Sequence, residues 1–402
     1  MSVTPAHIEA AHAVIRPHVH RTPTVAAPRL GEALGAEVWL KLENLQYTGS
    51  FKDRGSCNKL EQVVAAGAHA RGVIAASAGN HAQGVAHHAH RLGVAATIVM
   101  PVTTPFSKVE RTEAHGARVI LEGASVAECN DIARALAAAE GMVFVHPFDD
   151  PAIVAGQGTT AVEMLEDAPD LDTLVVPIGG GGLAAGIAVW AKHAKPAIRV
   201  FGVQTEKCPS MYAALRGEAA PPLDTHTLAD GIAVKTPGAL PVALLRDRLE
   251  EVLLVGEQDV EEAVQQLVGQ QKVVAEGAGA AGYAALLRHP HRFEGRRVGV
   301  VVCGGNIDRR MLSTVLLRGL KRDGKIAKLR VRIHDVPGVL SRVTQLIGAA
   351  GADVVDVEHQ RVFNHLAPRE AELHVVMETK GEAHVQLLLE QLGDAGFQAE
   401  PM

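Results

Sequence analysis

The chain has 402 residues, 47% of them hydrophobic and 21% charged, which is enough for two or three domains and a large core. A formal charge of −6 argues against general nucleic-acid binding, which requires a basic face. The N-terminal residues lack a signal-peptide pattern and no apolar run reaches the length of a membrane span, so we expect neither nucleic acid nor a membrane as a partner. The four cysteines stand far apart, which indicates reduced thiols in a cytoplasmic protein.

Strand and helix patterns alternate through the first third of the chain. Residues 4–16 predict a helix, with Thr4 as the N-cap and Pro5 at the first helical position. Residues 38–42 alternate and predict a strand. The patterns that follow predict strands at 73–76, 96–100, 118–121 and 143–145, and helices at 80–92, 105–115 and 124–139. Such alternation is typical of a parallel sheet with crossover helices.

A second set of strand and helix patterns follows. It predicts strands at 174–178, 198–203 and 298–303, and helices at 183–194, at 257–269 and from about 307. The two sets indicate an α/β fold with two lobes, and glycine-rich loops at 79, 179–182 and 304–305 follow predicted strands. Because the carboxyl ends of parallel strands border a crevice in such folds, we expect a ligand to bind between the lobes.

The pattern changes after a basic, glycine-punctuated stretch at 318–325. The following residues predict strands at 329–333, 354–357, 372–377 and 397–399, and helices at 339–350 and 383–392. The order β-α-β-β-α-β is that of a ferredoxin-like domain. We therefore place a linker at 321–326 and a separate domain at 327–402.

The stretch Thr48–Gly55 places Lys52 directly after an aromatic residue, Phe51, at the start of a predicted helix. The first turn of a helix carries unpaired amides and the positive end of the helix dipole, which disfavour a cation. The pKa of the Lys52 amine should therefore fall, and a neutral amine is the form that attacks carbonyl groups. By itself, the motif also fits a surface lysine or one paired with Asp53.

Two glycine motifs change this interpretation. Residues 77–84, Ser-Ala-Gly-Asn-His-Ala-Gln-Gly, follow a buried strand and lead into a helix near Asn80. Gly179–Gly182 lie between another buried strand and a helix, where their backbone N–H groups are free to converge on a phosphate. A lysine that can form a Schiff base, with a phosphate cradle that has no Walker lysine, suggests pyridoxal phosphate.

In this order, the stretch Thr48–Gly55, called the lysine string below, and the two glycine motifs resemble the β-family (tryptophan synthase-like) of pyridoxal-phosphate enzymes. Within that family they are most similar to threonine ammonia-lyase (threonine dehydratase). The resemblance spans about residues 1–320 and implies two α/β lobes, the smaller at approximately 45–145. It implies conversion of L-threonine to 2-oxobutanoate and ammonia, with L-serine, which yields pyruvate, as a second substrate. Isoleucine biosynthesis and threonine catabolism both remain open as the pathway.

The resemblance gives Lys52 two roles, as the covalent anchor of the cofactor and as the base that moves the proton on the substrate's α-carbon. It implies that Phe51 packs on the cofactor ring, that Asn80 donates to the 3′ oxygen and that Cys303 faces the pyridine nitrogen. A core residue at Phe51, a helix cap at Asn80 and a structural thiol at Cys303 are the alternative interpretations. The implied cofactor-binding residues are Phe51, Lys52, Asn80, Gly179, Gly180, Gly181, Gly182, Leu183 and Cys303.

The same resemblance carries two statements about the chemistry. A neutral thiol at Cys303 would not hold the ring nitrogen protonated as a carboxylate would, so the ring is a weaker electron sink and rapid loss of the β-leaving group is favoured. The substrate carboxylate is expected at the loop that contains Ser77, Gly79, Asn80 and His81. Glu276 lies in a further motif of the family near the cofactor, and its role is left open.

A serine racemase or serine dehydratase is the nearest alternative. The racemase has a second acid–base residue, a serine, at the position of Ala78, which has no exchangeable proton. Its divalent-metal carboxylates would align near Gln204 and Ser210, and the histidines at 87, 88 and 90 do not follow a ligand spacing, so we predict no metal site. Another alternative is an amino-acid-sensing protein whose enzyme lobe is inactive.

The C-terminal domain resembles an ACT domain, a family of small-ligand sensors. Its first strand–helix turn reads Asp335-Val-Pro337-Gly338, and glycine lets a ligand approach the backbone. The resemblance implies an amino-acid effector such as isoleucine or valine, bound near these three residues, and a homodimer or homotetramer. The alternative is a domain that only adds contact area to the oligomer.

Overall fold

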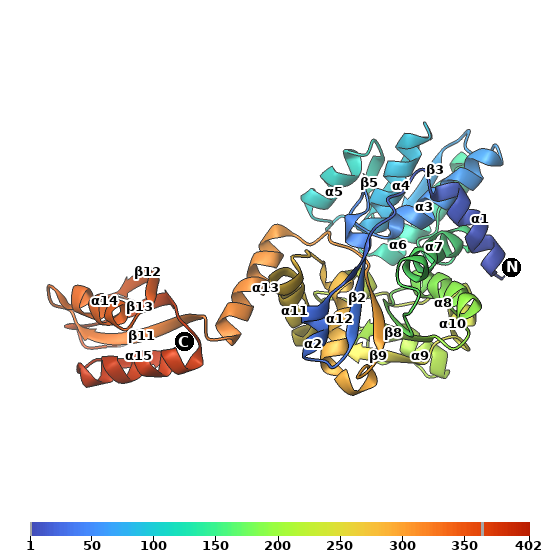
Figure 1. The fold of residues 1–402 in the computed structure, drawn as a ribbon. Helices are drawn as coiled ribbons and strands as arrows, with labels where there is room; N and C mark the ends of the chain where they lie inside the picture. Colours follow the sequence, from blue (N-terminus) through green and yellow to red (C-terminus); the bar gives the residue numbers. More distant parts are fainter. Residues whose placement is uncertain (1, 363–365) are drawn as a thin grey trace. The chain divides into compact units, whose positions relative to one another are not determined.

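The computed structural model describes residues 2–362 and 366–402 and divides into two compact units, Met1–Ile307 and Asp308–Met402 (Figure 1). The helices of the first unit are α1 (Pro5–Ile15), α2 (Pro28–Glu32), α3 (Lys52–Ala65), α4 (Asn80–Arg91), α5 (Phe106–Glu113), α6 (Val126–Glu140), α7 (Pro151–Asp167), α8 (Gly182–Ala194), α9 (Ser210–Arg216), α10 (Ala239–Leu245), α11 (Glu257–Gln266) and α12 (Gly277–Arg288). Short helical segments are η1 (Glu43–Leu45), η2 (Asp230–Ile232), η3 (Leu267–Gln271) and η4 (Pro290–Arg292).

The strands of the first unit form two sheets. They are β1 (Thr24–Ala26), β2 (Glu37–Leu42), β3 (Val73–Ala76), β4 (Ala96–Met100), β5 (Arg118–Leu121), β6 (Val143–Phe144), β7 (Thr173–Pro177), β8 (Arg199–Thr205), β9 (Glu251–Val255) and β10 (Arg297–Val302). The larger sheet has the order β1-β2-β10-β7-β8-β9, and the smaller has the order β5-β4-β3-β6. Except for the antiparallel edge strand β1, every pairing in these sheets is parallel, which confirms the predicted two-lobed α/β fold.

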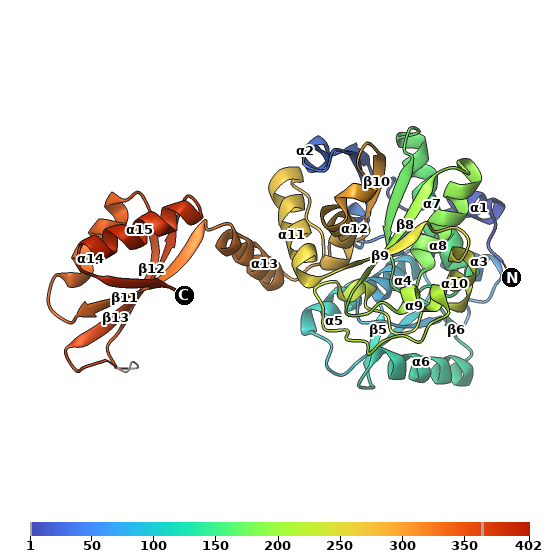
Figure 2. The same cartoon turned by 90° about the horizontal axis from the view of Figure 1, so that it is seen from below.

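Helices cover both faces of each sheet. In the smaller lobe, alternate side chains of β3 point to opposite faces, so Val73 and Ala75 pack with α3 and α4, whereas Ile74 and Ala76 pack with α6. In the larger lobe, α12 lies on one face of the sheet and α7 and α8 lie on the other (Figure 2). The described part of the chain has no helix that is both long and apolar enough to cross a bilayer.

Several elements of the larger lobe were not predicted, and α7 shows why. Thirteen of its 17 residues are buried, including Gln157, Thr159 and Glu163, so its sequence lacks the polar stripe that reveals a surface helix. Close packing requires glycine at two points. A Cβ on Gly156 would lie 2.7 Å from a backbone oxygen of α3, and one on Gly186 would lie 2.3 Å from the Val154 oxygen of α7.

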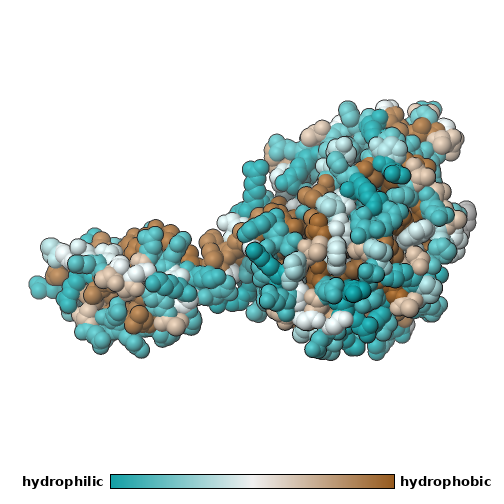
Figure 3. Space-filling view, viewed as in Figure 1, coloured by the Kyte–Doolittle hydropathy of each residue, from teal (hydrophilic) through white to brown (hydrophobic). Residues whose placement is uncertain are grey.

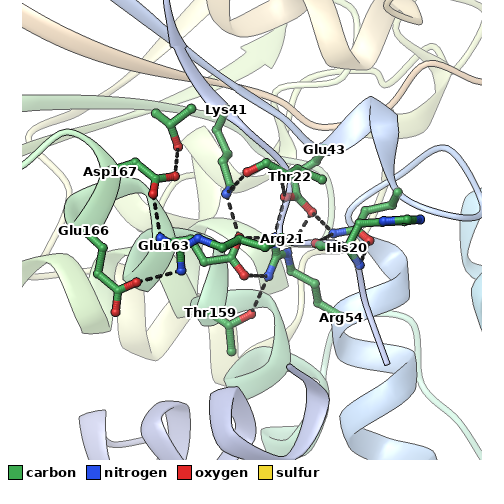
Figure 4. A network of polar contacts seen from close by, with 12 residues as sticks. His20, Arg21, Thr22, Lys41, Glu43, Arg54, Thr159, Glu163, Glu166 and Asp167 are labelled. Carbon is green, nitrogen blue, oxygen red and sulfur yellow. Dashed lines mark hydrogen bonds and ion pairs between the residues drawn. The ribbon is translucent and has the colours of Figure 1, made fainter. Parts of the chain in front are cut away.

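A buried ionic cluster joins α3 and α7 to the strand β2 (Figure 4). The Arg54 guanidinium donates to both carboxylate oxygens of Glu43, at 2.8 Å each, and to both oxygens of Glu163, at 2.8 and 2.6 Å. Its fifth N–H reaches the Thr159 hydroxyl at 3.1 Å, so all five donors are used. The ammonium of Lys41 donates to Glu163 at 2.6 Å. Two positive and two negative side chains therefore form a buried cluster with no net charge.

The ion pairs and hydrogen bonds of Arg54 offset the free-energy cost of burying these charged side chains. Glu43 is fully buried, which by itself would raise the pKa of its carboxyl, but the Arg54 charge and hydrogen bonds lower that pKa below its usual range. The hydroxyl of Thr22 and the amide of Gln46 also donate to Glu43, at 2.5 and 3.2 Å. Removal of one partner would leave a buried charge uncompensated, which is more costly than the pair is stabilising.

The second unit begins with α13 (Arg309–Arg322) and continues as β11 (Ile326–His334), α14 (Val339–Ala349), β12 (Asp353–Gln360), β13 (Glu370–Glu378), α15 (Glu382–Asp394) and β14 (Gln398–Pro401). Its antiparallel sheet has the order β12-β13-β11-β14, and this order with the two helices confirms the predicted ferredoxin-like fold. Residues 321–326, predicted as a linker, include the end of α13, a turn at Gly324 and the start of β11.

The surface of the second unit exposes apolar side chains on one helix. Met311, Leu317 and Leu320 of α13 are each at least 40% exposed, and hydrophobic atoms gather where this helix lies (Figure 3). Single exposed apolar residues are ordinary on protein surfaces, so it is the presence of three on one helix that distinguishes α13.

We expect Arg54→Leu to lower the free energy of unfolding of the first unit by about 3–5 kcal/mol, because Glu43 would be left buried without its cation and Glu163 would keep only Lys41. Arg21→Ala is the control, since Arg21 is 46% exposed and its pair with Glu166 is worth about 1 kcal/mol or less. Urea denaturation followed by circular dichroism measures both losses. Equal small losses in the two variants would contradict a structural role of the cluster.

Candidate active site

Lys52 is the first residue of α3 and is held by a backbone oxygen. Its Nζ donates to the Pro147 carbonyl at 2.8 Å, and burial lowers the pKa of the amine to about 8. The neighbouring Asp53 does not pair with it, because its carboxylate accepts from the Thr48 amide at 3.0 Å and from the Thr48 hydroxyl at 2.5 Å. The lysine is therefore oriented without a carboxylate partner, and about a tenth of it is uncharged at pH 7, far more than for a lysine with an ordinary pKa.

The lysine string is attached to the end of β10. The Phe51 amide donates to the Cys303 carbonyl at 3.0 Å, and Ser50 forms an isolated antiparallel bridge with Gly304. The Lys52 Nζ lies 5.0 Å from the centre of the Phe51 ring. Cys303 is 3% exposed, and burial raises the pKa of its thiol well above its usual range. The structure thus brings Phe51, Lys52 and a neutral thiol together at one strand end.

Asn80, the first residue of α4, lies in a chain of amide contacts. Its Nδ2 donates to Glu276 Oε1 at 2.7 Å, and its Oδ1 accepts from Asn306 Nδ2 at 2.8 Å. The same Asn306 nitrogen donates to the Thr48 carbonyl at 2.6 Å, which connects Asn80 back to the lysine string. These contacts join four segments of the chain, at Thr48, Asn80, Glu276 and Asn306.

The loop Gly179–Gly182 ends β7 and begins α8. Gly181 is the N-cap residue of α8, and its φ of 99° lies in the left-handed region that favours glycine. A Cβ on Gly180 would lie 2.3 Å from the Phe148 ring, so this ring packs directly against the loop backbone. Leu183 follows in the first turn of α8 and is buried. The first amides of α8 have no partner within the helix and are available to an anion.

Neutral side chains form hydrogen bonds with the backbone near this glycine loop. The Gln204 amide donates to the Ile178 carbonyl at 3.2 Å and accepts from the Tyr212 amide at 2.9 Å. The Ser210 hydroxyl donates to the Val234 carbonyl at 2.5 Å. Gln204 and Ser210 stand at the positions where the resemblance implies metal ligands in a serine racemase. Both side chains therefore form hydrogen bonds between neutral groups. The described residues include no group of three or more His, Cys, Asp or Glu side chains arranged to hold a metal ion.

The loop from Ser77 to His81 precedes and begins α4. The Gly79 amide donates to the Ser77 hydroxyl at 3.2 Å, and a Cβ on Gly79 would meet nothing within 4 Å, so there is open space beside the backbone. The His81 ring contacts the Val145 carbonyl through Nε2 at 3.0 Å, and burial lowers its pKa to about 3. The His81 ring is therefore neutral, and the main chain is the part of this residue that suits an anionic ligand.

The segment that follows β6 contributes to the site and was not predicted from the sequence. Pro147 holds the Lys52 amine, Phe148 packs on the glycine loop, and Asp149 accepts from the backbone amides of Ala239 and Leu240 at 3.2 and 2.9 Å. The available signal was its position, because the segment follows the carboxyl end of a parallel strand in the smaller lobe.

The donor set fits pyridoxal phosphate. A lysine whose pKa is lowered to about 8 suits a covalent bond to an aldehyde, and an uncharged glycine loop at a helix N-terminus suits a phosphate. Asn80 has an N–H for a ring oxygen, and the neutral Cys303 thiol suits an uncharged ring nitrogen. The site therefore contains a backbone cradle for the phosphate of this cofactor and side chains for its aldehyde and its ring.

The turn singled out in the second unit precedes α14. The Asp335 carboxylate accepts from Arg361 Nε at 2.9 Å, and Pro337 is exposed. Gly338 is the N-cap residue of α14, with a φ of 87°, and a Cβ there would meet nothing within 4 Å. The turn therefore presents open backbone to solvent in this unit.

Comparisons with known proteins agree with both units. The family described as "Pyridoxal-phosphate dependent enzyme" matches residues 15–304, and the ACT domain family matches residues 327–397. The L-threonine ammonia-lyase of Thermotoga maritima is 43% identical over 397 residues, which cover 98% of each chain. The processed form of threonine deaminase isoform 2 from Solanum lycopersicum has a TM-score of 0.74 at 30% identity, covering 80% of this chain and 91% of that chain. Maize serine racemase has a TM-score of 0.73 at 32% identity, covering 80% and 99%.

These matches confirm the predicted cofactor and the predicted ACT domain. The first match covers more than half of the chain and includes Lys52, Asn80 and the glycine loop. The chain therefore belongs to the pyridoxal-phosphate-dependent enzyme family and carries a C-terminal ACT domain.

Proposed function

We propose that the protein is a threonine ammonia-lyase, which converts L-threonine to 2-oxobutanoate and ammonia and also converts L-serine to pyruvate and ammonia. The observation that carries this proposal is the Lys52 amine, whose pKa is lowered to about 8 by burial and which Pro147 orients. Further support is the similarity to the L-threonine ammonia-lyase of Thermotoga maritima, which extends over 98% of this chain.

Each side chain of the site has a separate part in this reaction. Pyridoxal phosphate, when bound, supplies an electron sink for the bond that breaks at the substrate's α-carbon. Lys52 anchors the cofactor and, once its amine is free, removes the α-proton; an uncharged amine is the form that can do so. The amides of the loop from Ser77 to His81, at the N-terminus of α4, receive the substrate carboxylate.

Cys303 sets the balance between elimination and other outcomes. Its thiol is neutral because burial raises its pKa well above the usual range, so it does not stabilise a positive charge on the ring nitrogen. With the cofactor bound, a neutral group at this position would make its ring a weaker electron sink, which would favour departure of the β-hydroxyl from the substrate. This supports a lyase over an enzyme that returns the proton to the α-carbon.

Serine racemisation is the alternative reaction, and solved serine racemases resemble this chain. A racemase needs an acid–base group on each face of the substrate. Ala78 stands where the resemblance implies a serine for the second face, and its methyl group has no exchangeable proton. Racemisation is therefore at most a side reaction of this protein.

The second unit regulates the first in this proposal. The turn with Asp335, Pro337 and Gly338 binds a free amino acid, with isoleucine and valine as the first candidates. The protein acts in the cytoplasm as a homodimer or homotetramer, and the exposed apolar side chains of α13 support contact with another copy.

Lys52→Ala should reduce turnover of L-threonine by several orders of magnitude, since both the anchor and the base are lost. Lys59→Ala is the matched control on the same helix, and we expect its activity to stay within about threefold because a partly exposed ion pair is worth about 1 kcal/mol or less. The measurement is 2-oxobutanoate release by each purified variant. Retention of more than about a tenth of the activity by Lys52→Ala, where tenfold corresponds to about 1.4 kcal/mol of barrier, would refute the assignment.

Cys303→Asp should slow elimination and raise the yield of transamination and racemisation products. A carboxylate beside the ring nitrogen would keep that nitrogen protonated and deepen the electron sink. Cys303→Ser, which stays neutral, is the control and should keep the product ratio of the parent. Product analysis by chiral chromatography distinguishes the two, and an unchanged ratio in Cys303→Asp would mean that this side chain does not face the ring.

The regulatory proposal predicts that a chain ending at Lys325 loses a response that the full-length protein shows. Effector coupling of about 1–3 kcal/mol would change the apparent affinity for threonine about five- to 150-fold in the full-length protein. The measurement is the threonine saturation curve across a panel of free amino acids. In the full-length protein, Asp335→Ala should weaken the response, because it removes the contact with Arg361. Identical behaviour of all three proteins would make the domain structural.

A further inference from the structure

Glu276 forms a direct contact between the two lobes. It is the N-cap residue of α12 in the larger lobe, is 8% exposed, and accepts a hydrogen bond from Asn80 of the smaller lobe at 2.7 Å. Its own amide donates to the Gly304 carbonyl at 3.1 Å. The side chain is therefore fixed at both ends, by its backbone at the end of β10 and by its carboxyl at α4.

The chain of contacts determines which way the Asn80 amide faces. Because an ionised carboxylate can only accept hydrogen bonds, the group of Asn80 that faces Glu276 is Nδ2. On the other side, Asn306 Nδ2 lies between two oxygens, the Thr48 carbonyl at 2.6 Å and Asn80 Oδ1 at 2.8 Å. The orientation of the Asn80 amide is thus set by the Glu276 carboxylate, and that of the Asn306 amide is set by the Thr48 main-chain carbonyl.

One donor remains after these contacts are made. Asn80 Nδ2 carries two hydrogens, and Glu276 takes one. For the other, the part of the chain that the structure describes offers no acceptor, and Asn80 is partly exposed. With the amide reversed, this position would present an oxygen, which repels a ligand oxygen instead of binding it.

The surrounding backbone is shaped around this contact. A Cβ on Gly304 would lie 2.3 Å from Glu276 Oε1 and 3.2 Å from Asn80 Nδ2, so any side chain there would displace the pair. A Cβ on Gly231 would lie 3.6 Å from the same carboxylate oxygen. Glycine at position 304 is therefore required by the Glu276–Asn80 hydrogen bond itself.

We propose that Glu276 is a positioning residue, which holds the Asn80 amide so that its free N–H is presented to the ring oxygen of the bound cofactor. The proposal rests on the proposed function only for its cofactor. It assigns to Glu276 no contact with the substrate and no proton transfer to it.

The charges around Glu276 make this contact sensitive to pH. Burial, and next the carboxylate of Asp230 on η2, raise the pKa of Glu276 to about 7, while the Asn80 hydrogen bond and Lys108 of α5 lower it. Lys108 and Asp230 are themselves an ion pair at 3.2 Å, and the neutral thiol of Cys303 lies on the β10 side. Below about pH 7 the carboxyl is protonated and is a weaker acceptor, so the Asn80 amide is held less firmly at acid pH.

The test is a double-mutant cycle on cofactor binding. Glu276→Ala, Asn80→Ala and the double variant are prepared as apoproteins, and the Kd for pyridoxal phosphate is measured from the visible absorption of the bound cofactor. We expect each single variant to raise Kd about tenfold, and the double variant to raise it about tenfold as well, because Glu276 acts through Asn80. A roughly hundredfold increase in the double variant would show independent action and overturn the proposal.

Glu276→Gln covers the case in which Glu276→Ala fails to fold. The glutamine keeps an oxygen acceptor for Asn80 but does not titrate, so its Kd should stay within about threefold of the parent at pH 8. The parent's Kd should fall more steeply as the pH rises through about 7 than that of Glu276→Gln, in which the Lys52 amine still titrates but position 276 does not. The same pH dependence in both proteins would overturn the proposal. Because these measurements need no substrate, a failure of the threonine assay would reject the lyase function and leave the result on Glu276 intact.

Discussion

The bidentate contacts of Arg54 with Glu43 and Glu163 fix the first turn of α3 to η1 and α7, and Lys52 lies on the same turn. Lys52 is two residues before Arg54, and residues at i and i+2 lie on different faces of a helix. The buried carboxylates therefore hold the helix from one face while the amine lies on another. The pKa of Lys52 is lowered by burial and raised to a smaller extent by Cys303, with no carboxylate partner. The lysine and the two carboxylates therefore have separate partners, a backbone carbonyl for the lysine and an arginine for the carboxylates.

The end of β10 is the second point on which the site depends. Cys303 accepts from the Phe51 amide, the Gly305 amide donates to the Gly49 carbonyl at 2.9 Å, and Asn306 reaches both Thr48 and Asn80. The end of β10 thus aligns the lysine string with the loop that contains Asn80, although Asn306 is 258 residues from Thr48 along the chain. A parallel sheet makes this possible because its strands deliver their carboxyl ends to the same edge.

The sequence predicted the parts of this arrangement that local patterns encode. Buried strands such as β7 read as continuous apolar runs, and the glycine loop after it marks a helix start. The partners of the site residues were not predictable in the same way. Pro147 binds Lys52 through a main-chain oxygen, and every residue carries one, so its identity does not reveal the contact. Helix α7 was missed because it is buried nearly all round, and its ionic contact at Glu163 depends on a helix 109 residues away.

Burial drives the ionisable groups of the site toward their uncharged forms, and this determines how it recognises anions. The pKa of Lys52 falls to about 8 and that of His81 to about 3, while the pKa of Glu276 rises to about 7. At pH 7 the Lys52 amine is about nine-tenths protonated and His81 is neutral, so a phosphate or carboxylate that binds apart from the lysine does not meet a charged imidazole. The N-termini of α4 and α8 supply oriented backbone amides instead of a cation. These amides bind an anion but do not titrate, so they do not compete with Lys52 for the proton that it transfers. Recognition by helix ends thus leaves a single amine to carry out the proton transfer.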